Sequence, residues 1–207
     1  MRDQVFKAID VADEAALKAL LDQDPSLAES RSNDGLSVVL FTLYIARPEL
    51  TKILLSYEPE LDLFDLAALG GVGQISVMLA TNDKAVHEFS GDGFTALHVA
   101  SYFGQADVAK LLLDNGADID KIAMNGSDLS ALQSAVASCH SDVVKVLLEF
   151  NPDLNVRMLG GFTPLMSASA LGDQEIIDLL IAKGADQNLK ADDGRTAADF
   201  TKLSGNI

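Results

Sequence analysis

The chain repeats one short pattern at a nearly constant interval. The pattern is a hydroxyl residue followed two positions later by leucine or alanine, and its copies begin at Thr95, Ser130, Thr163 and Thr196. The starting residues stand 35, 33 and 33 positions apart. A period of this length indicates an array of similar units, because each unit cannot bury its apolar face alone and must stack on its neighbours.

Each repeated residue type has a physical role in a helix pair. A hydroxyl at the start favours a helix N-terminus, since its oxygen accepts a backbone N–H that has no partner within the helix. Pro164 suits the first turn, where no backbone N–H is needed. Gly104 and Gly172 are expected to end the first helix in the left-handed conformation. Val108 and Leu112 then follow at helical spacing and predict a second helix.

These segments resemble ankyrin repeats. The resemblance is carried by Thr163-Pro164-Leu165, by Thr95-Ala96-Leu97-His98, which lacks only the proline, and by the Gly-Ala-Asp endings at Gly116 and Gly184. We interpret the chain as a small stand-alone array of bacterial type. The resemblance implies an all-α solenoid of about seven helix-turn-helix units, with atypical N- and C-terminal caps and short loops or β-hairpins between units.

The first 90 residues follow the same register less clearly. A shift of 58 positions places Phe6 on Phe64, Ser32 on Ser90 and Tyr44 on Tyr102. We therefore predict one domain over 1–207, with a cap at about 3–31, units at 32–61, 62–89, 90–122, 123–157 and 158–190, and a partial cap at 191–207. The loop before Leu63 is expected to be missing or very short, and the loop near Met124 to be long.

Composition and charge exclude several classes of protein. The chain has 15 basic and 31 acidic residues, a net charge of −16, and neither half is basic. Nucleic acids and anionic membranes are poor candidates, since both bind clustered Lys and Arg. The longest apolar run, 38–46, is far too short to cross a bilayer. We expect a cytoplasmic monomer, and one cysteine provides no disulfide framework.

The sequence shows no recognisable catalytic, cofactor or metal site. His98 occupies the motif histidine, which in ankyrin repeats bonds backbone groups between units, and His87 and His140 have similarly ordinary positions. Cys139 stands where other units have glycine, and we expect it to be small and partly buried. Adjacent Cys139 and His140 rarely face each other, so we predict a protein that is not an enzyme.

The resemblance implies that a protein or peptide partner docks on the concave side, on loop tips and first-helix ends. Carried onto this chain, that surface contains an apolar and aromatic strip with polar ends. Its predicted members are Leu36, Tyr44, Ile45, Asp92, Phe94, Tyr102, Phe103, Leu129, Phe162, Leu171 and Arg195. Large aromatic residues are common at binding hot spots. Phe94 and Phe162 have an equally good alternative, which is packing on the next unit to stiffen the stack.

The main prediction is a non-catalytic scaffold that binds one partner in its concave groove. A narrower alternative is a dedicated inhibitor or immunity-type protein that blocks one enzyme. A structural module that self-associates through its ends, near Phe6 or Phe200, is a third possibility. An enzyme with a site around Cys139 and His140 is the fourth.

Overall fold

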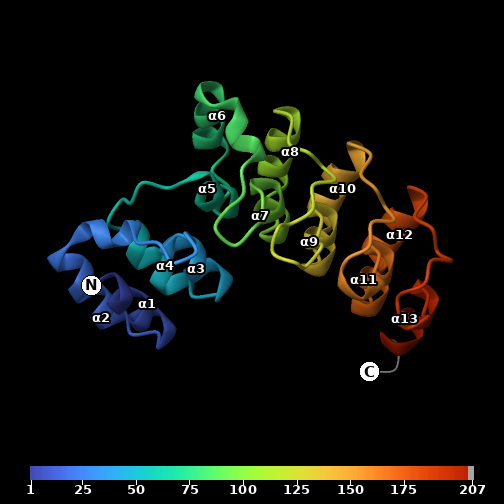
Figure 1. The fold of residues 1–207 in the computed structure, drawn as a ribbon, viewed down its shortest axis with the longest axis horizontal. Helices are drawn as coiled ribbons and strands as arrows, with labels where there is room; N and C mark the ends of the chain where they lie inside the picture. The colour runs from blue at the N-terminus through green and yellow to red at the C-terminus, as the bar shows by residue number, and fades with distance from the viewer. Residues whose placement is uncertain (205–207) are drawn as a thin grey trace.

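The structure is a computed structural model that describes residues 1–204. It consists of helix pairs stacked side by side. The first helices are α1 (Arg2–Asp10), α3 (Val38–Tyr44), α5 (Leu63–Leu69), α7 (Ala96–Tyr102), α9 (Ala131–Ala137) and α11 (Pro164–Leu171). The second helices are α2 (Glu14–Gln23), α4 (Pro48–Leu55), α6 (Val72–Thr81), α8 (Ala106–Asp114), α10 (Ser141–Glu149) and α12 (Gln174–Ala182). A final helix, α13 (Ala197–Ser204), packs on α11. Figure 1 shows the pairs arranged as an elongated, curved stack.

The structure confirms the helix boundaries that were predicted from the start and stop residues. The hydroxyls of Ser130 and Thr163 accept the backbone N–H three residues later, at 3.2 and 3.3 Å. Gly172 caps α11 with φ +72° in the left-handed region. Ala46 and Cys139 take the same turn at φ +52° and +56°, where a side chain is strained. Ala12 does the same in the α1–α2 turn at φ +55°, so three turns within helix pairs tolerate this strain.

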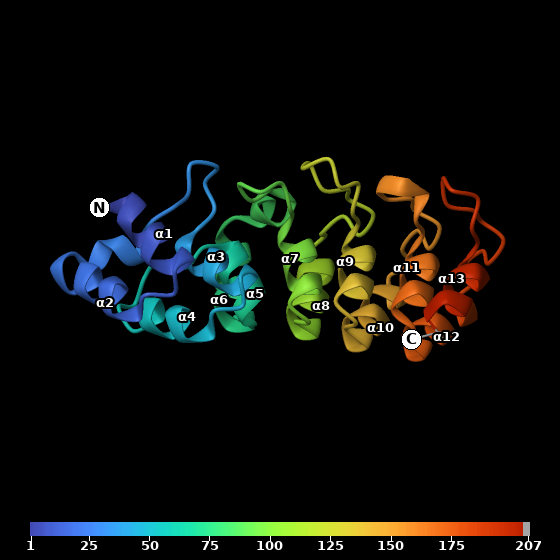
Figure 2. The same ribbon diagram turned by 90° about the horizontal axis from the view of Figure 1, so that it is seen from below.

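The loops between pairs project from one side of the stack, and Figure 2 shows the longest before α9. Antiparallel bridges close two of them, between Arg31 and Ser37 and between Phe89 and Thr95. Three single turns of 3₁₀ helix also lie between pairs, at Pro25–Glu29, Asp83–His87 and Leu159–Gly161. Within residues 1–204 the structure has no extended strand, only these bridges, so the predicted all-α class is confirmed.

Neighbouring loops are linked by a ladder of carboxylate and amide oxygens. The N–H of Asp153 donates to Asp120 Oδ1 at 2.8 Å, and the N–H of Asp186 donates to Asn155 Oδ1 at 3.0 Å. The two links are equivalent in adjacent units. Exposed backbone N–H groups at the loop bases are thereby satisfied by the preceding unit of the stack.

The apolar core divides into two clusters that meet near α3 and α5. One cluster contains buried residues from Val5 to Leu54, and the other runs from Leu40 to Phe200. α4 ends at Leu55 and α5 begins at Leu63, so the segment 56–62 between them is much shorter than the loops that connect the other pairs. We call this place the short joint.

The short joint changes the packing on both sides of the stack. The outer helices α2 and α4, α6 and α8, α8 and α10, and α10 and α12 pack against each other, whereas α4 and α6 hardly touch (Figure 1). On the loop side, the tip at Asp34 lies directly against the tip at Gly91. A Cβ atom on Gly91 would lie 1.8 Å from the carbonyl oxygen of Asp34, so only glycine fits.

No helix within residues 1–204 combines the length and the apolar character needed to span a membrane.

Candidate interaction surface

Three of the predicted aromatic residues form one cluster. The ring centroid of Tyr44, at the end of α3, lies 5.7 Å from that of Tyr102 and 5.4 Å from that of Phe103, both at the end of α7. The Tyr102 and Phe103 rings lie 5.0 Å apart, edge to face. Because α5 stands between α3 and α7 in the stack, Tyr44 reaches past a whole unit to make these contacts.

The cluster has one inner and one outer tyrosine. Burial, followed by the neighbouring Asp92 carboxylate to which its hydroxyl is hydrogen-bonded, raises the pKa of Tyr44 well above its usual value. Tyr102 keeps 44% of its surface exposed, and Ile45 beside Tyr44 keeps 36%. In this cluster the half-buried Tyr44 side chain holds the accessible Tyr102 ring in place. Well-packed aromatic rings of this kind are common at binding hot spots.

The other predicted strip residues contact different neighbours. Phe94 is half-buried, with its ring 5.7 Å from that of His98, and Phe162 lies 4.8 Å from Phe200 on α13. Phe162 thus contacts the following unit, whereas the Phe94 contact lies within its own unit. Arg195 lies over the same Phe200 ring at 4.4 Å and pairs with Asp193.

The last members of the strip differ in exposure. Leu36 and Leu129 are half-buried, and Leu171 is 51% exposed near α12. The structure therefore brings Tyr44, Ile45, Asp92, Tyr102 and Phe103 together as one patch and leaves the other six predicted residues outside it.

Polar side chains at the third position of the first helices connect adjacent units. His98 Nε2 lies 3.0 Å from the carbonyl oxygen of Leu129 in the following loop. Gln133 Nε2 donates to the carbonyl oxygens of Val156 and Phe162 in the next loop, at 3.3 and 3.2 Å. Burial lowers the pKa of His98, although the contact with Leu129 raises it, so burial favours the neutral imidazole. In that form Nε2–H can donate to Leu129 while Nδ1 accepts the N–H of Thr95 at 3.3 Å.

Asp65 occupies the same helix position at the short joint, but it binds in the opposite direction. Its carboxylate accepts from the hydroxyl of Ser37 in the preceding unit and, at 3.2 Å, from the N–H of Asp62. The side chain is buried, and this burial together with the charge of Asp62 raises its pKa to about 6. Sequence reasoning did not predict this role, although the acceptor-only chemistry of aspartate could have indicated it.

An ion pair lies next to Asp65. Arg31 Nη1 lies 2.8 Å from Asp62 Oδ2 and 3.2 Å from the carbonyl oxygen of Gly35. These groups surround a cavity of about 170 Å³ that also includes Phe89 and Gly91. The short joint is therefore held by a small polar network where the other joints have a longer loop.

The Cys139–His140 pair does not form a nucleophile and base. Cys139 is exposed, which corrects our expectation of partial burial, and desolvation and then Asp173 raise its thiol pKa. His140 Nε2 lies 3.0 Å from the carbonyl oxygen of Tyr102 in the previous unit. A reactive cysteine requires the opposite pKa shift and a base at hand.

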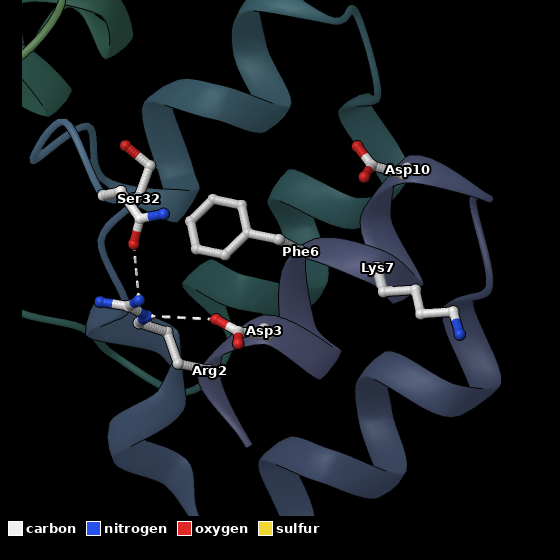
Figure 3. A pocket seen from close by; sticks show the side chains of 7 residues that line it. Arg2, Asp3, Phe6, Lys7, Asp10 and Ser32 are labelled. Carbon is white, nitrogen blue, oxygen red and sulfur yellow. Dashed lines mark hydrogen bonds and ion pairs between the residues drawn. The ribbon is translucent and has the colours of Figure 1, made fainter.

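The residues invoked for end-to-end association lie inside the two ends. Phe6 packs edge to face on Phe41 at 5.4 Å, beside a shallow cavity of about 240 Å³ at α1 (Figure 3). Figure 3 shows Arg2 engaged there, 3.5 Å from Asp3, while its Nη2 donates to Asn33 at 2.7 Å. Phe200 at the other end is only 4% exposed.

Within residues 1–204, no group of three or more His, Cys, Asp and Glu side chains could hold a metal ion. The geometry thus defines a helical repeat array with an aromatic patch on its inner side.

Comparisons with known proteins identify the repeat type. A family model of three ankyrin repeats matches residues 121–191, and a single ankyrin-repeat model matches residues 92–123. The B-cell lymphoma 3 protein homolog of Mus musculus is 38% identical over 99 residues, covering 48% of this chain and 22% of that protein. The neurogenic locus notch homolog protein 2 of Homo sapiens is 35% identical over 116 residues, or 56% of this chain and 5% of its own length. The Drosophila melanogaster Notch protein is 36% identical over 113 residues, 54% of this chain and 4% of its own.

Residues 92–191 are ankyrin repeats, and the fold is an all-helical ankyrin-repeat solenoid. The chain spans 22% or less of the lengths of these three relatives. Ankyrin repeats generally mediate contacts between proteins, through the extended surface that stacked units create.

Proposed function

We propose that this chain is a non-catalytic scaffold that binds one protein or peptide partner on its concave side, centred on Tyr102. The aromatic patch carries the proposal. An exposed aromatic ring that is already held by neighbouring side chains can bury apolar surface in a complex while losing little side-chain entropy. Its neighbours Ile45 and Asp92 add an apolar contact and a negative charge at the rim.

The same proposal extends to the less regular half. The first 91 residues have the same helix pairs, so we infer that they are divergent ankyrin units continuous with 92–191. The cytoplasmic location, the monomeric state and the bacterial type of the array stay predictions, as does the narrower function of an enzyme inhibitor.

Substitution of Tyr102 tests the proposal. Tyr102→Glu should remove the partner from affinity captures made with native cell extract, with a loss of at least about 30-fold in affinity, as expected at a hot spot. Tyr102→Phe keeps the ring and should retain most binding. Ile181→Glu adds the same charge at an exposed position of α12 and serves as the control.

Circular dichroism and thermal unfolding would verify that all three variants fold. If every co-purifying protein stays bound to folded Tyr102→Glu, the proposed site is wrong.

A further inference from the structure

Helix α6 differs from the other second helices in its exposed face. Counted from the N-cap of each first helix, Val77 occupies the position of Lys52 in α4, Lys110 in α8, Lys145 in α10 and Asp178 in α12. Gln74 likewise stands where the others have Glu49, Asp107, Asp142 and Glu175. α6 has no charged side chain, and Val77 is 68% exposed.

In α4 and α10, the residues at these two positions form ion pairs. Lys52 lies 3.1 Å from Glu49, and Lys145 lies 3.3 Å from Asp142. These pairs keep the outer faces of α4 and α10 hydrated. In α6 an exposed valine takes the place of such a pair, so the outer face of this helix is apolar. Apolar surface of this kind often marks an interaction site.

This surface forms one wall of a groove at the short joint. The groove has a volume of about 690 Å³ and runs between α6 and the segment 56–62. Its lining is mainly apolar and contains Pro59, Leu61, Leu66, Val77 and Met78. It opens where α4 and α6 fail to pack, whereas the outer helices at the other joints cover each other (Figure 1).

We propose that the groove binds an amphipathic helix of another protein, one with Lys or Arg along one edge of its apolar stripe. A helix fits because it would supply the packing that α4 and α6 lack, in the manner of a helix in a groove. The basic edge is set by the rim on the α4 side, where Glu58 and Glu60 are exposed. Glu29 adds a third carboxylate, which accepts the N–H of Glu60 at 3.3 Å.

Charge also argues against a second copy of this chain as the occupant. Glu60 is the only charged residue that lines the groove, and each copy has a net charge of −16. Two copies that met here would bring like charges together with no basic side chain in the lining to offset them. A basic partner is instead attracted by the negative electrostatic field of the whole chain.

A double substitution tests the proposal without changing the net charge. Gln74→Asp/Val77→Lys gives α6 the residue types present in α4, α8 and α10, so the fold should be unaffected. The probe is a synthetic amphipathic helix of leucine and lysine, and a leucine and glutamate peptide of the same pattern is its counterpart. Methyl NMR would locate binding, and fluorescence anisotropy would measure it at physiological salt.

We expect the lysine peptide to shift the methyl signals of Leu61, Val77 and Met78 and to bind the double variant at least about tenfold more weakly. The glutamate peptide should not bind. Ile181→Lys, which adds positive charge on α12, should leave the affinity within about twofold, as should Tyr102→Glu, since that ring lies in the other site.

Three outcomes would overturn the proposal. They are no binding of the lysine peptide to the unmodified chain, equal binding to the folded double variant, and methyl shifts confined to the Tyr102 face. A dimer in light scattering that the double substitution dissociates would show that a second copy occupies the groove instead. Since the Tyr102 variants report on the concave site alone, failure of either proposal would not imply failure of the other.

Discussion

His98 and Asp65 occupy the same position of their helices, yet they hold their joints together by opposite chemistry. His98 is a buried neutral donor that reaches forward to the next loop, while Asp65 is a buried acceptor that reaches back to Ser37. At the regular joints of α7 and α9, a carbonyl oxygen of the following loop receives the donor. The short joint has no such loop, so it uses a carboxylate, an ion pair and a bridging tyrosine instead. A repeat stack can therefore lose its standard connector at one joint if another set of contacts replaces it.

The largest expected effect is at the regular joint. His98→Ala removes a fully buried ring and leaves the backbone N–H of Thr95 without its acceptor, His98 Nδ1. It also removes one of the two contacts of the Leu129 carbonyl oxygen, which still accepts the N–H of Ala123. We expect a loss of about 3 kcal/mol in the free energy of unfolding, from the cavity and the unpaired group together. Urea denaturation would measure it. His140→Ala, at a half-exposed histidine that also contacts a carbonyl, is the control and should lose less than about 1 kcal/mol.

The two joints should respond to acid in opposite senses. The folded pKa of Asp65 is raised from 3.8 to about 6, so its contribution to stability is present below pH 4 and is lost as pH rises through about 6, by about 3 kcal/mol at 1.4 kcal/mol per unit. The folded pKa of His98 is lowered from 6.5, so its contribution is present above pH 6.5 and is lost on acidification.

Hydrogen exchange at pH 5 and pH 7 would separate these responses. Between pH 7 and pH 5, amides of α5 should gain protection relative to those of α7 and α9. Asp65→Asn, which cannot ionise, should flatten the pH dependence at α5 while leaving that at α9 unchanged. A uniform change across both joints, or an unchanged profile in Asp65→Asn, would show that Asp65 is not the group responsible.

A smaller effect is expected at two of the strained turns, which lie on opposite sides of the short joint. Cys139→Gly and Ala46→Gly place glycine where φ is positive, as in the equivalent Gly104 and Gly172. Relief of the left-handed strain exceeds the extra entropy of the unfolded glycine, so each should stabilise by about 0.5–1 kcal/mol. Thermal unfolding would detect this as a higher Tm. Gly172→Ala should have the reverse effect.

The smallest effect is expected within α7, the helix that contains His98 and whose end contacts Tyr44. The hydroxyl of Ser101 is fully buried and is without a hydrogen-bond partner among the described residues. Ser101→Ala should therefore be neutral or stabilising by less than about 1 kcal/mol, since it removes an unsatisfied polar atom. Calorimetry would test this, with Ser134→Ala, which removes a bonded hydroxyl, expected to destabilise.

Local chemistry made much of the fold predictable from the sequence. Thr163, Pro164 and Gly172 each determine backbone geometry at their own position, so they locate α11 in any context. The long loop before α9 and the short connection before Leu63 followed from spacing alone. Both are properties of neighbouring residues, and no long-range contact is needed to infer them.

The sites were less predictable because they depend on which units touch. Tyr44 and Tyr102 were expected on the same surface, but the contact between them depends on how closely α3 and α7 approach across α5, which neighbouring residues do not determine. The reversed bond of Asp65 depends on Ser37 lying in the preceding unit. Val77, by contrast, was detectable in the sequence, since aligned units have charge at its position.

The contact between Asp34 and Gly91 determines where this array can be cut and rejoined. At joints such as that between α9 and α11, the loops meet through backbone and amide links that recur from unit to unit, so a unit can be exchanged or added there. At the short joint, a side chain on Gly91 would collide with the carbonyl oxygen of Asp34, and an inserted connector would have to force the two tips apart. We therefore expect that residues 32–122 must be kept together in any engineered array, while the units that follow can be exchanged individually.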